Sequence, residues 1–390
     1  MNTSILKISN SVQNADLQRA FDLCVRKARS NIERLADEPK AAPWAVDGNY
    51  FGHPEGFFEI GNWTSSFLTG MALIAWRAVE DEYFLRQTLR LAPVYREKAT
   101  TRRLDMHHDA GFLYSLYSIA LYKLTGDKQH RETGLAAAAA LYERFNHQGG
   151  FIRAWGRLDS NEFDNMAIID CMMNLPLLYW ASNESGDKKF HDAAVRQADN
   201  TLKLFIRPDE SVYHAYRFDL KTGQPLGGDN YCGRAVESHW ARGTTWGIYG
   251  FALSYRYTGD KKYLDASLRL ARKFNQLMNG DAIPVWDFKL PAGEAPLRDT
   301  SAGAVAVCAF QELEKLGAAD APITKAKESL LQKLCTDKYL NFDESVPGVL
   351  RDGQVGSNGP GSAQNAYMTW GDYYLMEALD RELNQGETWW

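Results

Sequence analysis

Two aspartates lie in surroundings where a carboxylate is unusual, and both could take part in proton transfer. Asp109 ends the polar stretch His107-His108-Asp109, directly before the apolar run that starts at Ala110. Asp170 has isoleucines on one side and cysteine and methionine on the other. A carboxylate that loses its water in such a setting costs on the order of several kcal/mol if it stays ionised and unpaired. Buried acids of this kind are enriched at active sites, so the pair predicts acid/base chemistry.

The two carboxyl groups are expected to ionise at different pH. Asp109 precedes a predicted helix over 110–124, whose positive N-terminal end favours the charged form. Asp170 is predicted to lie about two turns inside a second helix, over 164–183, where loss of water raises its pKa. One group then serves as an acid/base and the other as a charged stabiliser. Simple helix capping by Asp109 and a hydrogen-bonded structural role for Asp170 are the alternatives.

Aromatic and cationic residues also stand at the starts of predicted helices. The apolar pattern places Trp63, Arg242 and Trp246 there. Tryptophan faces pack on apolar sugar surfaces, and an arginine neutralises an anionic group. Core packing for the tryptophans, and capping of a neighbouring helix for the arginine, are the ordinary alternatives. Asp299 is also at a helix start, and there a simple cap is the better interpretation.

Other chemistries lack their motifs. The five cysteines form neither a C-x-x-C pair nor a cluster with histidine, which disfavours a disulfide framework or a zinc site. There is no G-x-S-x-G elbow, P-loop or H-E-x-x-H motif, and the glycines over 227–233 match no dinucleotide fingerprint. The sequence therefore predicts acid/base chemistry without a cofactor or a metal ion.

Composition narrows the class of partner. The 44 Lys and Arg residues against 49 Asp and Glu give a net charge of −5, so neither nucleic acid nor an anionic membrane is expected as a partner. No apolar run is long enough for a membrane span, and the first residues lack the apolar core of a secretory signal. Together with five free thiols, these features favour a cytoplasmic globular protein. The 11 Trp, 19 Tyr and 18 Phe residues fit either a sugar site or a large core.

Helical periodicity dominates the chain and predicts an all-α protein. Apolar residues recur at a spacing of three or four. The pattern predicts twelve helices, over 17–35, 63–79, 81–97, 110–124, 128–145, 164–183, 187–206, 243–258, 260–278, 299–316, 321–338 and 368–384. The helix over 110–124 is apolar nearly all round, which is typical of an inner layer. The helices over 187–206 and 260–278 carry charge on one face, as an outer layer would.

A repeated turn joins the helices in pairs. Gly126-Asp127, Gly186-Asp187 and Gly259-Asp260 each combine a glycine that ends one helix with an aspartate that caps the next. Intervals of 60 and 73 residues separate the three glycines, the scale of a helical hairpin with a variable loop. Short turns therefore alternate with long connections. All the long connections meet at one end if successive helices are antiparallel.

Six helical hairpins whose long connections all lie at one end predict an (α/α)6 barrel. This is a six-hairpin toroid, formed here by a single domain over residues 1–390. A stacked solenoid is the alternative, but it would not bring six long loops together. In the barrel, the starts of the inner helices share the loop end. Asp109, Asp170 and the helix-start tryptophans are therefore expected to converge there, where sites are usually built.

Six ordered stretches around these residues stand out: Asn62-Trp63-Thr64, His108-Asp109-Ala110-Gly111-Phe112, Ile169-Asp170-Cys-Met-Met-Asn174-Leu175, Trp240-Ala-Arg242-Gly243-Thr-Thr-Trp246, Asp299-Thr300-Ser301-Ala302 and Trp370-Gly371-Asp372-Tyr373-Tyr374. At these positions the chain resembles the unsaturated glucuronyl hydrolases, glycoside hydrolase family 88. The likeness runs from about Trp63 to Tyr374. Several motifs in one order are far more specific than any one alone.

The resemblance implies an (α/α)6 barrel that removes the 4,5-unsaturated uronic acid left by polysaccharide lyases at the non-reducing end of oligosaccharides. It implies that Asp170 is the catalytic acid/base and Asp109 a second essential aspartate. It also implies substrate contacts for Trp63, His108, Trp155, His214, Arg242 and Trp246. Family members often have glutamine after the Arg-Gly pair, whereas this chain has Thr244.

In the reaction that the resemblance implies, Asp170 protonates C4 of the double bond and then activates a water that adds at C5. The hemiketal opens and releases the remaining sugar. Attack at the anomeric carbon is the alternative. A related rhamnogalacturonyl hydrolase, a sugar 2-epimerase with a histidine pair, and a non-catalytic glycan-binding toroid stay open as alternative functions.

Overall fold

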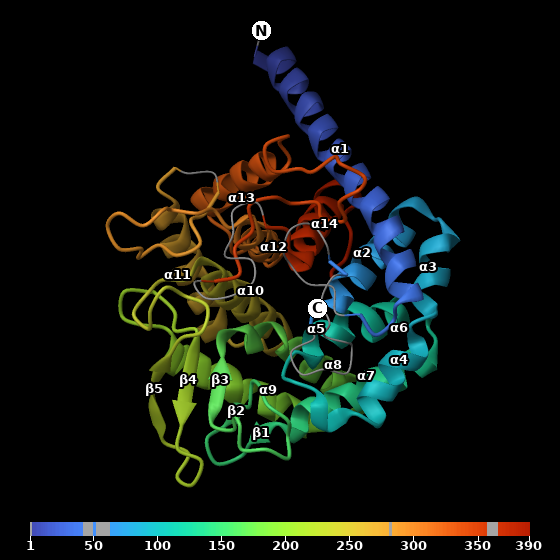
Figure 1. Cartoon of the computed structure of the whole chain (residues 1–390). Coiled ribbons are helices and arrows are strands. Elements are labelled where there is room, and N and C mark those ends of the chain that lie inside the picture. The colour runs from blue at the N-terminus through green and yellow to red at the C-terminus, as the bar shows by residue number, and fades with distance from the viewer. Residues whose placement is uncertain (1, 42–49, 52–62, 281–282, 357–365) are drawn as a thin grey trace.

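The computed structural model describes residues 2–41, 50–51, 63–280, 283–356 and 366–390. Helices make up most of this part of the chain (Figure 1). Their bounds are α1 (Asn2–Asp37), α2 (Ser65–Val79), α3 (Glu82–Leu89), α4 (Ala92–Thr100), η1 (Arg103–Asp105), α5 (Ala110–Tyr114), η2 (Ser115–Ile119), α6 (Ala120–Thr125), α7 (Lys128–Glu143), η3 (Ile169–Met173), α8 (Leu175–Ser185), α9 (Lys188–Asn200), η4 (Thr201–Phe205), α10 (Ala241–Thr258), α11 (Lys261–Met278), α12 (Thr300–Lys315), α13 (Ala321–Leu334) and α14 (Thr369–Asn384).

The helices form two concentric rings, as Figure 1 shows. The inner ring runs through α2, the continuous α5–η2–α6 helix, η3 with α8, α10, α12 and α14, and each member contacts the next. The ring closes where α14 packs against α2. The predicted (α/α)6 barrel is therefore confirmed. No helix in the described ranges is both long and apolar enough to span a bilayer.

Three departures from the predicted helices have local causes. α1 begins at Asn2 rather than at residue 17, in a stretch that contains no glycine or proline. The outer helix predicted over 81–97 is divided into α3 and α4, because Pro93 belongs in a first helical turn. The third departure concerns Asp170, and it decides how the site is built.

The predicted short turns are confirmed. Gly126, Gly186 and Gly259 adopt left-handed conformations, with φ of 71°, 77° and 70°. Each following aspartate caps the next helix by accepting a bond from a backbone N–H group two residues later. These turns lie at the end of the barrel opposite the long connections, and they set the antiparallel order of the helices.

The long connections carry two small antiparallel sheets. β1 (Phe145–Asn146) pairs with β2 (Phe151–Ile152), and β3 (Met166–Ile168), β4 (Ala215–Phe218) and β5 (Pro225–Asp229) form a second sheet in that order. In Figure 1 both sheets lie at the lower left of the ring, near α9, and β3 leads directly into η3. They fasten the loops that position the candidate site.

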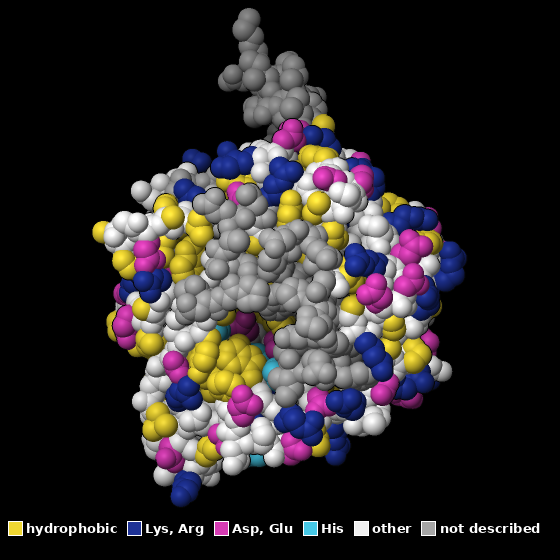
Figure 2. All heavy atoms as spheres, in the orientation of Figure 1, with side chains coloured by type: hydrophobic (Ala, Val, Ile, Leu, Met, Phe, Trp, Pro, Cys, Tyr) yellow, Lys and Arg dark blue, Asp and Glu magenta, His cyan; other side chains and the backbone are white. Residues whose placement is uncertain are grey.

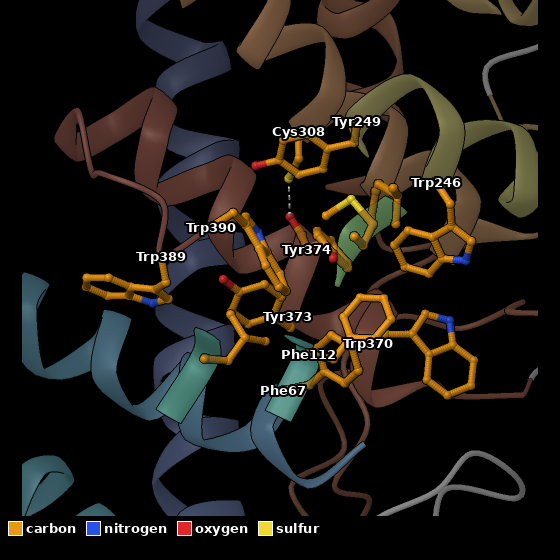
Figure 3. Packing of buried hydrophobic residues seen from close by; sticks show 14 of the residues in the cluster. Phe67, Phe112, Trp246, Tyr249, Cys308, Trp370, Tyr373, Tyr374, Trp389 and Trp390 are labelled. Carbon is orange, nitrogen blue, oxygen red and sulfur yellow. Dashed lines mark hydrogen bonds between the residues drawn. The ribbon is translucent and has the colours of Figure 1, made fainter. Parts of the chain in front are cut away.

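The chain after α14 returns into the middle of the ring. Trp390 is buried beside Tyr373 and Tyr374, and its ring meets that of Phe112 edge to face with centroids 5.9 Å apart (Figure 3). Trp389 lies under the guanidinium of Arg77, 4.4 Å from its ring centroid. The segment over 385–390 therefore fills the half of the barrel away from the long loops.

Candidate active site

Asp170 lies at the start of an inner-ring element rather than two turns inside one. The helix predicted over 164–183 is wrong in its first part, because Met166–Ile168 form β3 and the chain then enters the 3-10 turn η3. Pro176 explains the break, since it lacks the N–H group that an unbroken helix needs and is confined to the first turn of α8. The antiparallel pairing of β3 with β4 fixes where the turn begins.

The Asp170 carboxyl is buried but reachable, with 14% of its side-chain surface exposed. Its Oδ2 atom has no hydrogen-bond partner among the described residues and lies 3.6 Å from Nε2 of His214. Burial raises the pKa of Asp170 to about 6, and the charge of Asp109 adds to this, while His108 and Arg242 oppose it. The predicted direction of the shift is confirmed, and such a group exchanges its proton close to neutral pH.

His214 faces Asp170 with a defined nitrogen. Its Nδ1 atom accepts hydrogen bonds from the backbone N–H groups of Tyr231, at 2.9 Å, and Cys232, at 3.2 Å. In a neutral imidazole one nitrogen accepts and the other carries the proton, so these bonds place the proton on Nε2. Burial lowers the pKa of His214 to about 3, which keeps the ring neutral. The ring thus presents an N–H group to the Asp170 carboxyl.

Asp109 occupies the N-cap position of α5, but its side chain makes no capping bond. Helix capping therefore does not explain this residue. Its Oδ1 atom lies 3.3 Å from Nε2 of His108. Burial acts to raise the pKa of Asp109, but His108, His107 and Arg144 outweigh it and hold that pKa below its ordinary value. The expected charged state is confirmed, with neighbouring side chains as its cause.

Arg144 organises the loop that carries Asp109, and no sequence motif marks it. Its buried guanidinium donates to the carbonyl oxygens of Met106, at 2.7 Å, and Trp155, at 2.7 Å, as well as to two more carbonyls of the 153–156 loop. Burial lowers the pKa of Arg144 to about 9. Its positive charge reaches Asp109, so it both fastens this part of the site and favours the ionised carboxylate.

The tryptophans form two groups. Trp63 and Trp246 each pack against Phe112, with ring centroids 5.4 Å from it. Trp155 packs instead with His214 and with Tyr231, whose ring is 5.1 Å away. Figure 2 shows hydrophobic side chains gathered over β3 beside a hollow, where acidic and histidine side chains come into view. Trp63 and Trp155 are partly exposed, whereas Trp246 is buried.

Arg242 is bound within the protein. Its guanidinium donates to Asp299, at 2.9 Å, and to the carbonyl oxygens of Gln354 and Val355, at 2.5 and 2.7 Å. It also lies over the rings of Trp240 and Trp370. Asp299 itself caps α12, as predicted. Arg242 therefore joins α10, α12 and the loop before α14.

Comparison with known proteins decides the family. Residues 55–309, well over half of the chain, match glycosyl hydrolase family 88. The chain belongs to this family. It is therefore a glycoside hydrolase, as the motifs around Asp109 and Asp170 indicate.

The sequences of relatives of this family 88 protein align with it over nearly their whole length. It is 34% identical to an unsaturated glucuronyl hydrolase of Bacillus sp. strain GL1 over 333 residues, 84% of this chain and 87% of that one. It is also 34% identical to an unsaturated chondroitin disaccharide hydrolase of Streptococcus pyogenes serotype M1 over 382 residues, 96% and 93% of the two chains. The crystal structure of the Bacillus enzyme superposes with a TM-score of 0.86 and 31% identity, covering 96% of this chain and 99% of that one.

In the family 88 barrel, the predicted site residues differ in their distances from one another and in their exposure to the hollow. Asp170 lies 3.6 Å from His214 and feels the charge of Asp109, which in turn lies 3.3 Å from the fully buried His108. Trp63 and Trp155 retain exposed surface. Among the described residues, no group of three or more histidine, cysteine or acidic side chains has the geometry of a metal site.

Proposed function

We propose that this hydrolase removes the 4,5-unsaturated uronic acid from the non-reducing end of lyase-generated oligosaccharides, with Asp170 as acid and then base. One observation carries the assignment: a buried carboxyl with a pKa of about 6 keeps one oxygen free of hydrogen bonds within the described chain and faces a neutral histidine. The names of the relatives, which act on unsaturated glucuronyl and chondroitin saccharides, support the same substrate class.

The reaction begins with proton transfer from Asp170 to C4 of the enol-ether double bond. Positive charge develops at C5 and on the ring oxygen as the proton arrives. The Asp170 carboxylate then takes a proton from water while the water oxygen bonds to C5. The resulting hemiketal opens to a C5 ketone, and the hemiacetal at C1 releases the remaining sugar as an alcohol. Asp170 ends protonated, as it began, so one carboxyl serves both steps.

Asp109 stays ionised through this sequence. The low pKa that His108 and its neighbours impose suits a group that stabilises developing positive charge and orients sugar hydroxyls. The N–H group of His214 stabilises the Asp170 carboxylate after the first proton transfer.

The sugar contacts divide by exposure. We assign direct contact to Trp63 and Trp155, which retain exposed surface that can pack on sugar C–H groups. The buried candidates His108, His214, Arg242 and Trp246 shape the hollow and its electrostatic field. Arg242 contributes its positive charge to the site while Nη1 and Nη2 bind Asp299 and backbone carbonyls.

The test uses the ultraviolet absorbance of the conjugated enoate. Adding the purified protein to lyase-generated oligosaccharides should abolish this absorbance, and Asp170→Asn should prevent the loss. No decay with any such oligosaccharide contradicts the proposal and favours a binding toroid. Full activity of Asp170→Asn with a 2-epimerase substrate favours the epimerase.

The site of water attack is tested with deuterium. Hydration through Asp170 in D2O should place deuterium at C4 in a single configuration, because the enzyme delivers it from one side. Attack at the anomeric carbon instead releases an enol that picks up deuterium in solution, which would give a mixture of C4 configurations.

A further inference from the structure

We infer that Asn174 is a positioning residue that holds the backbone segments of Asp109 and Asp170 at a fixed separation. Its side-chain Oδ1 accepts a hydrogen bond from the backbone N–H group of Phe112, at 2.8 Å. Its Nδ2 atom donates to the backbone carbonyl oxygen of Asp170, at 3.1 Å. One fully buried side chain therefore connects the first turn of α5 to the turn η3. This inference rests on the proposed roles of the two aspartates.

The bond to Phe112 explains why the Asp109 carboxylate is available for chemistry. The first N–H groups of a helix have no partner within the helix, and an aspartate at the N-cap normally accepts from one of the next residues. In α5 the Asp109 side chain makes no such bond, and Asn174 satisfies the N–H group of Phe112 instead. The cap is thus supplied from another inner-ring element, which frees Asp109 to face the hollow.

Gly111 shows how close the two segments lie. A methyl group added at Gly111 would come within 2.3 Å of the Cα atom and 2.6 Å of the carbonyl oxygen of Asn174. Such contacts require a shift of backbone, because no flexible side-chain end can move aside. The glycine and the asparagine therefore act together: one permits the approach and the other fastens it.

Asparagine is suited to this place because it offers an acceptor and a donor on one short, uncharged group. Alanine offers neither. Aspartate keeps the acceptor but loses the donor to the Asp170 carbonyl. A displacement of about 1 Å between catalytic groups can lower a rate about 100-fold, so loss of this link should reduce turnover more than substrate binding.

The experiment compares Asn174→Ala, Gly111→Ala and the double variant with a matched control, Gln311→Ala. Gln311 is also buried, and its side-chain amide donates to a carbonyl of a neighbouring inner helix, Ala378, at 2.9 Å, but away from the loop end. We expect Asn174→Ala and Gly111→Ala each to lower kcat about 10- to 100-fold with KM changed less than about threefold. The double variant should be no worse than the worse single one, because both changes break the same contact.

Gln311→Ala should lose thermal stability with kcat retained in the folded protein. Unchanged kcat in Asn174→Ala, a loss that appears only in KM, or strictly additive losses in the double variant would each overturn the inference. If Asn174→Ala does not fold, Asn174→Asp gives a second readout: it keeps an acceptor for Phe112, loses the donor to the Asp170 carbonyl and adds a buried carboxyl, and unchanged kcat in that variant would equally overturn the inference. Activity of Asp109→Asn and Asp170→Asn tests the underlying proposal separately: full activity there removes the proposed function, whereas inactive aspartate variants beside a fully active Asn174→Ala remove only this inference.

Discussion

Two buried acidic side chains in opposite halves of the barrel, Glu377 and Asp170, have opposite surroundings. In the half away from the long loops, Glu377 accepts hydrogen bonds from Tyr249 and Tyr373, both at 2.7 Å, and from the indole of Trp390, at 2.9 Å. At the loop end, Oδ2 of Asp170 accepts none from the described chain. A buried carboxylate with several donors is a structural group, whereas one without them holds its proton and is ready to give it up.

Asp372 shows that burial alone does not distinguish the proposed catalytic carboxyl. It begins an inner helix at the loop end, and burial raises its pKa to about 7. Its carboxylate nevertheless accepts from the hydroxyl of Tyr50, at 2.5 Å, and from the backbone N–H groups of Val349 and Leu350, at 3.0 and 2.8 Å. Asp372 therefore holds two loops in place. It differs from Asp170 because its carboxylate has hydrogen-bond donors, whereas Oδ2 of Asp170 has none among the described residues.

The largest expected effect separates the two halves directly. Asp170→Asn should lower kcat about 1,000-fold, the range that a general acid/base supplies. Glu377→Gln should instead leave kcat of the folded protein nearly unchanged and lower stability by about 1–3 kcal/mol, because buried donors lose a charged acceptor. Steady-state kinetics and thermal unfolding on both variants measure this. Equal kcat losses would remove the distinction between the halves.

The pH dependence tests the same carboxyl in the intact enzyme. In the proposed reaction Asp170 donates the proton and Asp109 is charged, so activity should fall about tenfold per pH unit above the Asp170 pKa of about 6. Asp109 must be ionised, and its lowered pKa places the acidic limb below the ordinary range of a carboxyl. A profile of kcat/KM with substrate well below KM reads both limbs. Asp372→Asn should keep the alkaline limb. Loss of that limb in this variant would mean that Asp372, and not Asp170, causes the fall in activity at high pH.

The pH dependence of stability should separate Asp170 from Asp372, because only Asp372 also accepts several hydrogen bonds. The raised pKa means that the folded protein prefers the protonated Asp170, so ionisation costs stability as the pH rises through about 6. A shift of about two units corresponds to about 3 kcal/mol, an upper bound for the gain expected from Asp170→Asn at pH 8. The gain should vanish below pH 4, where the carboxyl is protonated in both states. The raised pKa of Asp372 predicts the same pH-dependent gain for Asp372→Asn, but this variant also loses hydrogen bonds from Tyr50 or the 349–350 backbone at every pH, so at pH 4 only Asp372→Asn should destabilise. Denaturant unfolding at pH 4 and pH 8 distinguishes the outcomes.

Local features of the sequence suffice to predict the barrel, whereas most of the unpredicted features of the site depend on long-range contacts. The Gly126-Asp127 type of turn is determined by neighbouring residues, and it is found as predicted. The start of the inner helix at Asp170 was misplaced although Pro176, a local signal, was available. The pairing of Arg242 with Asp299 and the grip of Arg144 on loop carbonyls form only when the ring closes. No periodicity in the chain encodes them.

The smallest expected effect compares two tryptophans. Trp155 is partly exposed at the loop end and packs on Tyr231, whereas Trp389 is buried in the other half against Arg77. Trp155→Ala should raise KM about fivefold, because one aromatic contact is worth about 1 kcal/mol, with little change in stability. Trp389→Ala should leave KM unchanged and lower the free energy of unfolding by about 3–5 kcal/mol, as expected for an aromatic residue removed from a core. Both changes replace a tryptophan by alanine, so their effects on KM can be compared directly. If Trp389→Ala raises KM as much as Trp155→Ala does, the far half of the barrel shapes the sugar site directly, and the two halves do not have separate roles.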